Sequence, residues 1–156
     1  MTKLSLALER LKSVATVTPE FQGSDVYAGI KEQYDDFLRT YPSVAGLHDY
    51  LEFLRLTGGA HAHNQLFSLV LYGFGGYVVP SFDEGLFLDR ERYFLFGEAL
   101  YPRQPEPNAV FFAFDTALDG AVCWVREEHG AFTHCADSFS DLLLDFAEAR
   151  YPGGTE

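Results

Sequence analysis

Residues 108–146 read NAVFFAFDTALDGAVCWVREEHGAFTHCADSFSDLLLDF. Within this stretch, Ala109–Asp115 is a short apolar and aromatic run, which is typical of a strand buried on both faces. Asp119-Gly120 indicates a hairpin turn, because glycine accepts the positive φ that such turns need. Ala121–Val125 supplies the returning strand, and residues 131–136 supply a third. The stretch therefore predicts three neighbouring strands of an antiparallel sheet.

The same stretch ends in a helix whose beginning can be read from the sequence. We expect this helix to start at Asp137 or Ser138, with Ser138 and Asp141 forming a variant of the capping box. Four apolar residues follow with the i, i+3, i+4, i+7 spacing of one helical face, namely Phe139, Leu142, Leu143 and Phe146.

Three further helices are predicted before the strands. Residues 3–15 form an amphipathic pattern, and residues 25–40 keep a second apolar stripe. Residues 43–57 form the third pattern, with Ser43 as the expected N-cap. Gly58-Gly59 ends that helix in the manner of a glycine C-cap.

Short strands follow, separated by turns rather than by helices. We expect strands at residues 66–71, 77–79, 86–88 and 93–96, in addition to those of residues 109–136. Residues 16–23, 60–65 and 98–108 are expected to be loops. Helices that precede and follow a group of about six strands predict an α+β fold, with a mostly antiparallel sheet and the helices packed on one face.

The composition places limits on function. The chain has 156 residues, of which 23 are acidic and 11 basic, for a net charge of −12. Nucleic acids and anionic membranes are disfavoured as partners, since both are bound through Lys and Arg. A basic protein partner would be attracted, although the excess charge is equally consistent with solubility alone.

The length predicts one domain, for which we expect residues 25–152, preceded by an amino-terminal helix and linker at 1–24 and followed by a tail at 153–156. Charged residues interrupt Met1–Leu11, and no apolar run reaches the length of a membrane span. The sequence therefore predicts a cytoplasmic protein.

Histidine and cysteine side chains are the candidates for chemistry. On an extended segment, His61 and His63 would point to one face like metal ligands, but a site needs further ligands, so a polar loop is the favoured interpretation. His134 and Cys135 are neighbours on a predicted strand and would point to opposite faces, which argues against a catalytic dyad. Cys123 and Cys135 are expected to be free thiols. We predict no catalytic residue, no metal site and no cofactor.

Several short segments resemble one known family. They are the third predicted helix running into two glycines (GLHDYLEFLRLTGG, Gly46–Gly59), the segment LFGE at Leu95–Glu98, the Asp-Gly hairpin, and the closing helix SFSDLL at Ser138–Leu143. Together they resemble the SUKH superfamily over residues 25–150. That family includes the yeast cell-wall-assembly and glucan-synthesis regulator and many bacterial immunity proteins.

The resemblance implies a non-enzymatic α+β domain that binds another protein. Our leading hypothesis is an immunity protein that neutralises a basic toxin, such as a nuclease or deaminase, by covering its active cleft. Candidate contact residues are acidic and aromatic groups expected on the strand loops and a hairpin tip: Asp83, Glu84, Glu98, Tyr101, Glu127 and Glu128. The alternatives are a regulatory interaction module without a toxin and, less favoured, a metal-dependent hydrolase using His61 and His63. Exposed strand edges are compatible with a homodimer.

Overall fold

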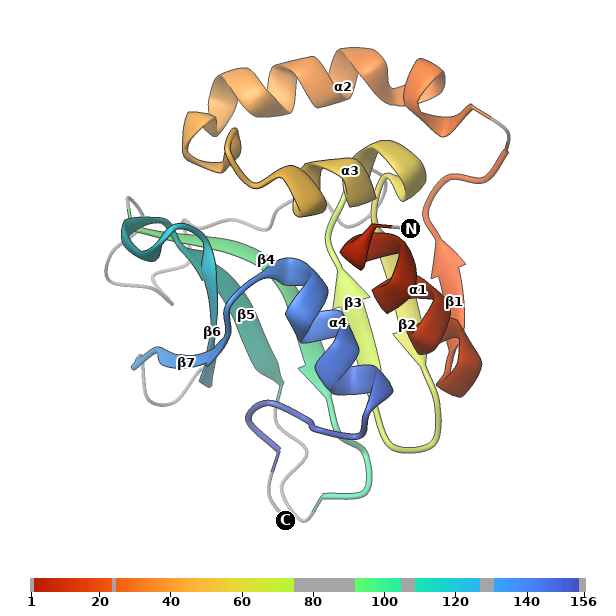
Figure 1. The fold of residues 1–156 in the computed structure, drawn as a ribbon, viewed down its shortest axis with the longest axis vertical. Coiled ribbons are helices and arrows are strands. Elements are labelled where there is room, and N and C mark those ends of the chain that lie inside the picture. The colour runs from red at the N-terminus through yellow and green to blue at the C-terminus, as the bar shows by residue number, and fades with distance from the viewer. Residues whose placement is uncertain (1, 24, 75–91, 105–108, 127–130, 155–156) are drawn as a thin grey trace.

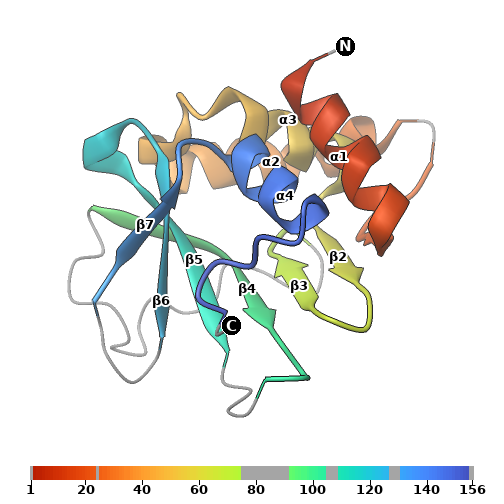
Figure 2. The ribbon, with the colours of Figure 1, turned by 60° about the horizontal axis from the view of Figure 1, so that its bottom comes forward.

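The computed structural model describes residues 2–23, 25–74, 92–104, 109–126 and 131–154. The described residues form an antiparallel sheet with α-helices gathered on one of its faces, as Figures 1 and 2 show. The helices are α1 (Lys3–Val14), α2 (Val26–Thr40), α3 (His48–Thr57) and α4 (Phe139–Ala147), with short 3-10 helices η1 (Pro42–Val44) and η3 (Thr116–Leu118). The strands are β1 (Thr16–Pro19), β2 (Ala60–His63), β3 (Ser68–Leu71), β4 (Tyr93–Leu100), β5 (Val110–Asp115), β6 (Ala121–Arg126) and β7 (Thr133–Ala136). The α+β prediction is confirmed.

The seven strands lie in the sheet in the order of the sequence, each antiparallel to the next. Six of these described strands come after α3, but β1 comes before α2 and α3. It reaches the sheet edge by pairing Thr16 with His63 and Pro19 with Ala60. Strand β1, near the amino terminus, is therefore part of the same sheet as the predicted hairpin.

The core lies between the helices and one face of the sheet, and aromatic rings fill it. Phe96 on β4 stacks on Phe114 of β5 with ring centroids 4.1 Å apart. Tyr50 of α3 and Phe139 of α4 pack on these rings from the helix side, and the ring centroids of Tyr50 and Phe139 are 5.3 Å apart. Phe146 is 1% exposed, and each such fully buried ring contributes on the order of 1.5–3 kcal/mol relative to exposure.

The closing helix α4 forms as the sequence indicates. Ser138 is its N-cap: the hydroxyl accepts the N–H of Asp141 and donates to that residue's carboxylate at 2.9 Å. The predicted apolar face, Phe139, Leu142, Leu143 and Phe146, is fully buried. The Asp119-Gly120 turn also forms as expected, with φ of 54° and 80°.

Helix α1 packs along α4. Its Leu4, Ala7 and Leu11 are buried in the common core, and Lys3 Nζ lies 2.5 Å from the Asp141 carboxylate. The amino-terminal helix therefore shares its core with the rest of the described chain.

The start of the third helix differs from the prediction. Ser43 was expected to cap it, but α3 begins at His48 after Leu47, which makes no side-chain cap. Pro42 instead opens the separate turn η1, because proline suits the first position of a helical turn, where no N–H is needed. Gly58 ends α3 at φ 67°, as predicted.

Two segments expected to be loops are strands. Thr16–Pro19 forms β1, and Ala60–His63 forms β2. The backbone of β1 pairs with β2, and β2 also pairs with β3. The partner of β1 is distant in the sequence, and each of these strands is only four residues long, so neither segment shows a local strand pattern. Strand β4 is also longer than expected and ends at Leu100. The strands predicted at residues 77–79 and 86–88 lie outside the described residues.

Candidate functional site

Two of the predicted contact residues can be placed: Glu98 lies within β4, and Tyr101 follows directly after that strand. Glu98 is inside β4, on the sheet face turned away from the helices, where it is partly exposed and accepts a hydrogen bond from the Tyr72 hydroxyl at 3.0 Å. A role of Glu98 in binding a partner stays a prediction. The other four, Asp83, Glu84, Glu127 and Glu128, lie outside the described residues.

Tyr101 is a core residue, which corrects its expected place on the surface. Its side chain is 2% exposed, and its hydroxyl donates to the carbonyl oxygen of Pro152 at 2.6 Å. The ring lies against Phe146 and Tyr151. The segment after α4 therefore covers the Tyr101 side chain, which is too buried to contact a partner.

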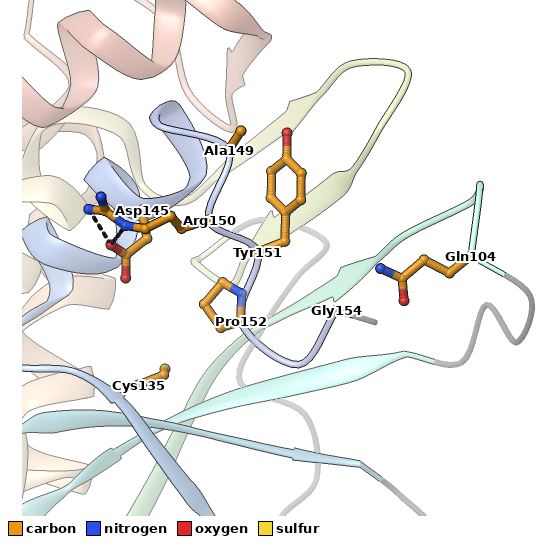
Figure 3. A pocket seen from close by; sticks show the side chains of 8 residues that line it. All are labelled: Gln104, Cys135, Asp145, Ala149, Arg150, Tyr151, Pro152 and Gly154. Carbon is orange, nitrogen blue, oxygen red and sulfur yellow. Dashed lines mark hydrogen bonds and ion pairs between the residues drawn. The ribbon is translucent and has the colours of Figure 1, made fainter. Parts of the chain in front are cut away.

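A cavity of about 530 Å³, lined by both polar and apolar groups, lies where the chain leaves α4 (Figure 3). Arg150 turns toward Asp145 there, at 2.9 Å, and also contacts Glu148 at 2.7 Å. Cys135 of β7 lines the same cavity, but burial, more than the nearby Cys123 and Asp145, raises its pKa to about 12. A thiol in that state is a poor nucleophile at neutral pH.

The Cys–His dyad considered in the sequence is not assembled. Cys135 packs against the core on the helix side of the sheet, while His134 is exposed and lies 3.8 Å from Asp137. Cys123 is a buried free thiol whose pKa is raised, chiefly by burial. Trp124 is half-buried and also packs against the core from the helix side. Cys123, Cys135 and Trp124 therefore all take part in packing.

An apolar cavity of about 330 Å³ lies between α2, α3 and the end of β3. Aromatic side chains dominate its lining, which includes Phe37, Tyr41, Tyr50 and Phe74. The rings of Phe37 and Phe74 contact each other in this lining, with centroids 5.5 Å apart.

A wide groove of about 740 Å³ lies where α1, α3 and α4 begin; we call it the helix-end groove. Four carboxylates, two cations and one histidine are among its lining residues. They are Asp49, Glu52, Asp137, Asp141, Lys3, Arg55 and His48. The sequence did not point to this groove, because its residues come from three separate segments.

Two of the groove's carboxylates hold the helices together. Asp49 of α3 accepts both the N–H and the hydroxyl of Ser140, the second residue of α4. Burial acts to raise the pKa of Asp141, but hydrogen bonds from Lys3 and Ser138 outweigh it and lower that pKa. The other two carboxylates, those of Glu52 and Asp137, extend the negative charge toward solvent; Asp137 is exposed.

His61 and His63 lie side by side on β2, on the sheet face away from the helices, with ring centroids 5.0 Å apart. The expectation that both rings share one face is confirmed, although the segment is a strand and not a loop. Within the described part of the chain, no group of three or more His, Cys, Asp or Glu residues is placed to hold a metal ion.

Among the described helices, none combines the length and apolar character needed to cross a membrane. Comparison with known proteins gives no assignment: no protein-family model matches this chain, and no curated protein matches its sequence.

Proposed function

We propose that this chain is a cytoplasmic, non-enzymatic protein-binding domain of the immunity type, which neutralises a basic toxin by covering the toxin's active surface. The resemblance of residues 25–150 to the SUKH superfamily suggests this class. The helix-end groove is the observation that supports it most directly, because it is a concave, carboxylate-rich surface in a chain of net charge −12.

The groove suits a basic partner because contacts within the fold hold two of its carboxylates in place. Asp49 is fixed by Ser140 at 2.9 and 2.8 Å, and Asp141 is fixed by Ser138 and Lys3. Carboxylates held in this way need no rearrangement to meet an Arg or Lys side chain. Rigid complementary charge gives specificity and fast association more than raw affinity.

Much of the chain's positive charge is already neutralised within the chain. Lys31 pairs with Asp35, Arg39 pairs with Asp36, and Arg150 pairs with two carboxylates. Glu52 makes no ion pair with any described residue, so its charge is available to a partner. A field of this sign would steer a basic protein toward the groove and would weaken as salt increases.

The test is co-expression with the toxin candidate encoded beside this gene. We expect restored growth and co-purification of a stable complex whose association slows at high salt. Undiminished toxicity in the presence of this protein would overturn the proposal. A cellular partner captured in a genome without toxin-like neighbours would instead support the regulatory module.

Charge reversal locates the binding surface. Glu52→Lys and Asp137→Lys should each weaken the complex by at least about ten-fold, because each would place like charges in contact. The matched control is Glu32→Lys, at an exposed acidic residue on α2 that lies outside the groove. Equal weakening by all three variants would show that only overall charge matters. No weakening by the groove variants would place the contact elsewhere.

A further inference from the structure

The histidine pair on β2 has the geometry of a chelate. His61 and His63 alternate with Ala60 and Ala62, which are buried in the helix-side core. Both imidazoles therefore stand on the outer face of the sheet, with planes inclined by 31° and centroids 5.0 Å apart. Strand pairing on both sides of β2 fixes the separation of the two rings. Two histidines on a flexible loop would have no fixed separation.

Ser68 on the neighbouring strand β3 orients one of the two rings. Its hydroxyl lies 2.9 Å from His61 Nε2. Histidines that bind metals usually hydrogen-bond through the ring nitrogen that does not face the metal, which fixes the tautomer and the ring orientation. In the tautomer whose Nε2–H donates to Ser68 Oγ, Nδ1 of His61 carries the lone pair that a metal requires.

The residues paired with the two histidines in the sheet have uncharged side chains. Opposite the pair, the strand partners are Thr16 and Thr18 on β1 and Ser68 and Val70 on β3, none of which is ionisable near neutral pH.

We propose that His61 and His63, oriented by Ser68, form a two-histidine chelate for a divalent transition metal ion on the outer sheet face. Imidazole nitrogen selects Cu²⁺, Ni²⁺ and Zn²⁺ over Mg²⁺ and Ca²⁺, and the affinity of a given site rises toward Cu²⁺. Metal–nitrogen bonds of about 2.0–2.1 Å bring the two ring nitrogens onto one ion. Water fills the remaining coordination positions, since His63 is exposed.

Among the residues that the structure describes, no third His, Cys, Asp or Glu joins the pair. The site leaves coordination positions open, so a partner's side chain could replace a water there. The proposal does not depend on the proposed immunity function, since it concerns the opposite side of the sheet from the helix-end groove.

The experiment measures binding of CuCl₂ and ZnCl₂ to protein without a histidine tag, by titration calorimetry, with the Cu²⁺ spectrum recorded by electron paramagnetic resonance. We expect one equivalent of Cu²⁺ with nitrogen coupling from two imidazoles, and weaker binding of Zn²⁺. His61→Gln and His63→Gln should each reduce Cu²⁺ affinity at least about ten-fold and leave one coupled nitrogen.

His134→Gln is the matched control, because it removes a single exposed histidine elsewhere on the protein and should leave both affinity and spectrum unchanged. Ser68→Ala tests the positioning role and should weaken binding by about 10-fold or more while two nitrogens remain coupled. Wild-type affinity in the His61→Gln and His63→Gln proteins, or a one-nitrogen spectrum in the wild type, would overturn the proposal. Unchanged circular dichroism of the variants checks that the fold persists.

Discussion

Asp49 of α3 binds Ser140 of α4 through two hydrogen bonds to the same carboxylate oxygen, 2.9 Å from the backbone N–H and 2.8 Å from the hydroxyl. Ser140 is fully buried at the beginning of α4. The contact satisfies an N–H that the first turn of a helix cannot satisfy itself. It also joins two helices at the floor of the helix-end groove, so the stability of the fold and the shape of the groove depend on the same pair.

Replacing Asp49 by alanine should therefore destabilise the protein more than an ordinary surface change. We expect Asp49→Ala to lower the free energy of unfolding by about 2–3 kcal/mol, since hydrogen bonds to a charged group are lost and a buried hydroxyl is left unpaired. Urea denaturation at pH 7 measures this difference. Glu52→Ala, one turn along the same helix, should change stability by less than about 0.5 kcal/mol. Similar values for the two variants would contradict the structural role of Asp49.

The two serines considered as helix caps should behave differently. Ser138 accepts the N–H of Asp141 and caps α4, whereas Ser43 lies in η1 and caps no α-helix. We expect Ser138→Ala to cost about 1 kcal/mol and Ser43→Ala to be close to neutral. Thermal unfolding of both variants beside the wild type gives the comparison. A larger cost for Ser43→Ala would mean that α3 is capped as the sequence alone suggested.

Gly73 cannot carry a side chain without moving the chain around it. A Cβ there would lie 1.7 Å from the carbonyl oxygen of Gly58, in the turn that ends α3. We expect Gly73→Ala to destabilise the protein by more than about 3 kcal/mol or to prevent folding, because backbone on both sides must separate.

Gly29 provides the control for this substitution. It lies within α2, and a Cβ at that position meets no atom within 4 Å. Gly29→Ala should stabilise the protein by about 0.5–1 kcal/mol, through helix propensity. Expression level and denaturation midpoint distinguish the two variants, and tolerance of Gly73→Ala would show that β3 and the end of α3 are less closely packed than described.

Asp115 should make stability depend on pH at the acidic end. Arg92 donates two hydrogen bonds to its buried carboxylate, both at 2.9 Å, and chiefly these, opposed by burial, lower the pKa of Asp115 from 3.8. A carboxyl whose folded pKa is lowered stabilises the protein fully above its ordinary pKa. That contribution is lost as the pH falls through the lower folded value.

Asp115→Asn should therefore cost about 1.5–3 kcal/mol at pH 7, and its difference from wild type should shrink below about pH 4. Denaturation at pH 7, 4 and 3 measures the trend. The control is Asp119→Asn in the same hairpin, where asparagine also tolerates the φ of 54° and stability should change by less than about 0.5 kcal/mol. A difference for Asp115→Asn that is constant with pH would contradict the role of the Arg92 pair.

Local sequence was sufficient to predict an element where the residues that determine it lie within one short segment. Ser138 and the four apolar residues of α4 lie within a few residues of one another, so capping and helical spacing could be read directly. The end of α3 at Gly58 could also be read from the sequence, because the positive φ that ends the helix depends on that residue alone. The Asp119-Gly120 turn follows from the same argument. The grouping of strands between helices was enough to give the α+β class.

Tertiary structure decided what depends on a distant partner. Thr16–Pro19 becomes a strand only because Ala60–His63 lies beside it. The hydrogen bonds between two such segments produce no pattern in the sequence of either one. Tyr101 stands in a proline-rich stretch but is buried because Phe146 and Tyr151 pack against its ring, and the carbonyl oxygen of Pro152 accepts a hydrogen bond from its hydroxyl. The helix-end groove likewise exists only where three helices begin together. Periodicity and capping therefore determine single elements, whereas burial and the gathering of charge are properties of the packed chain.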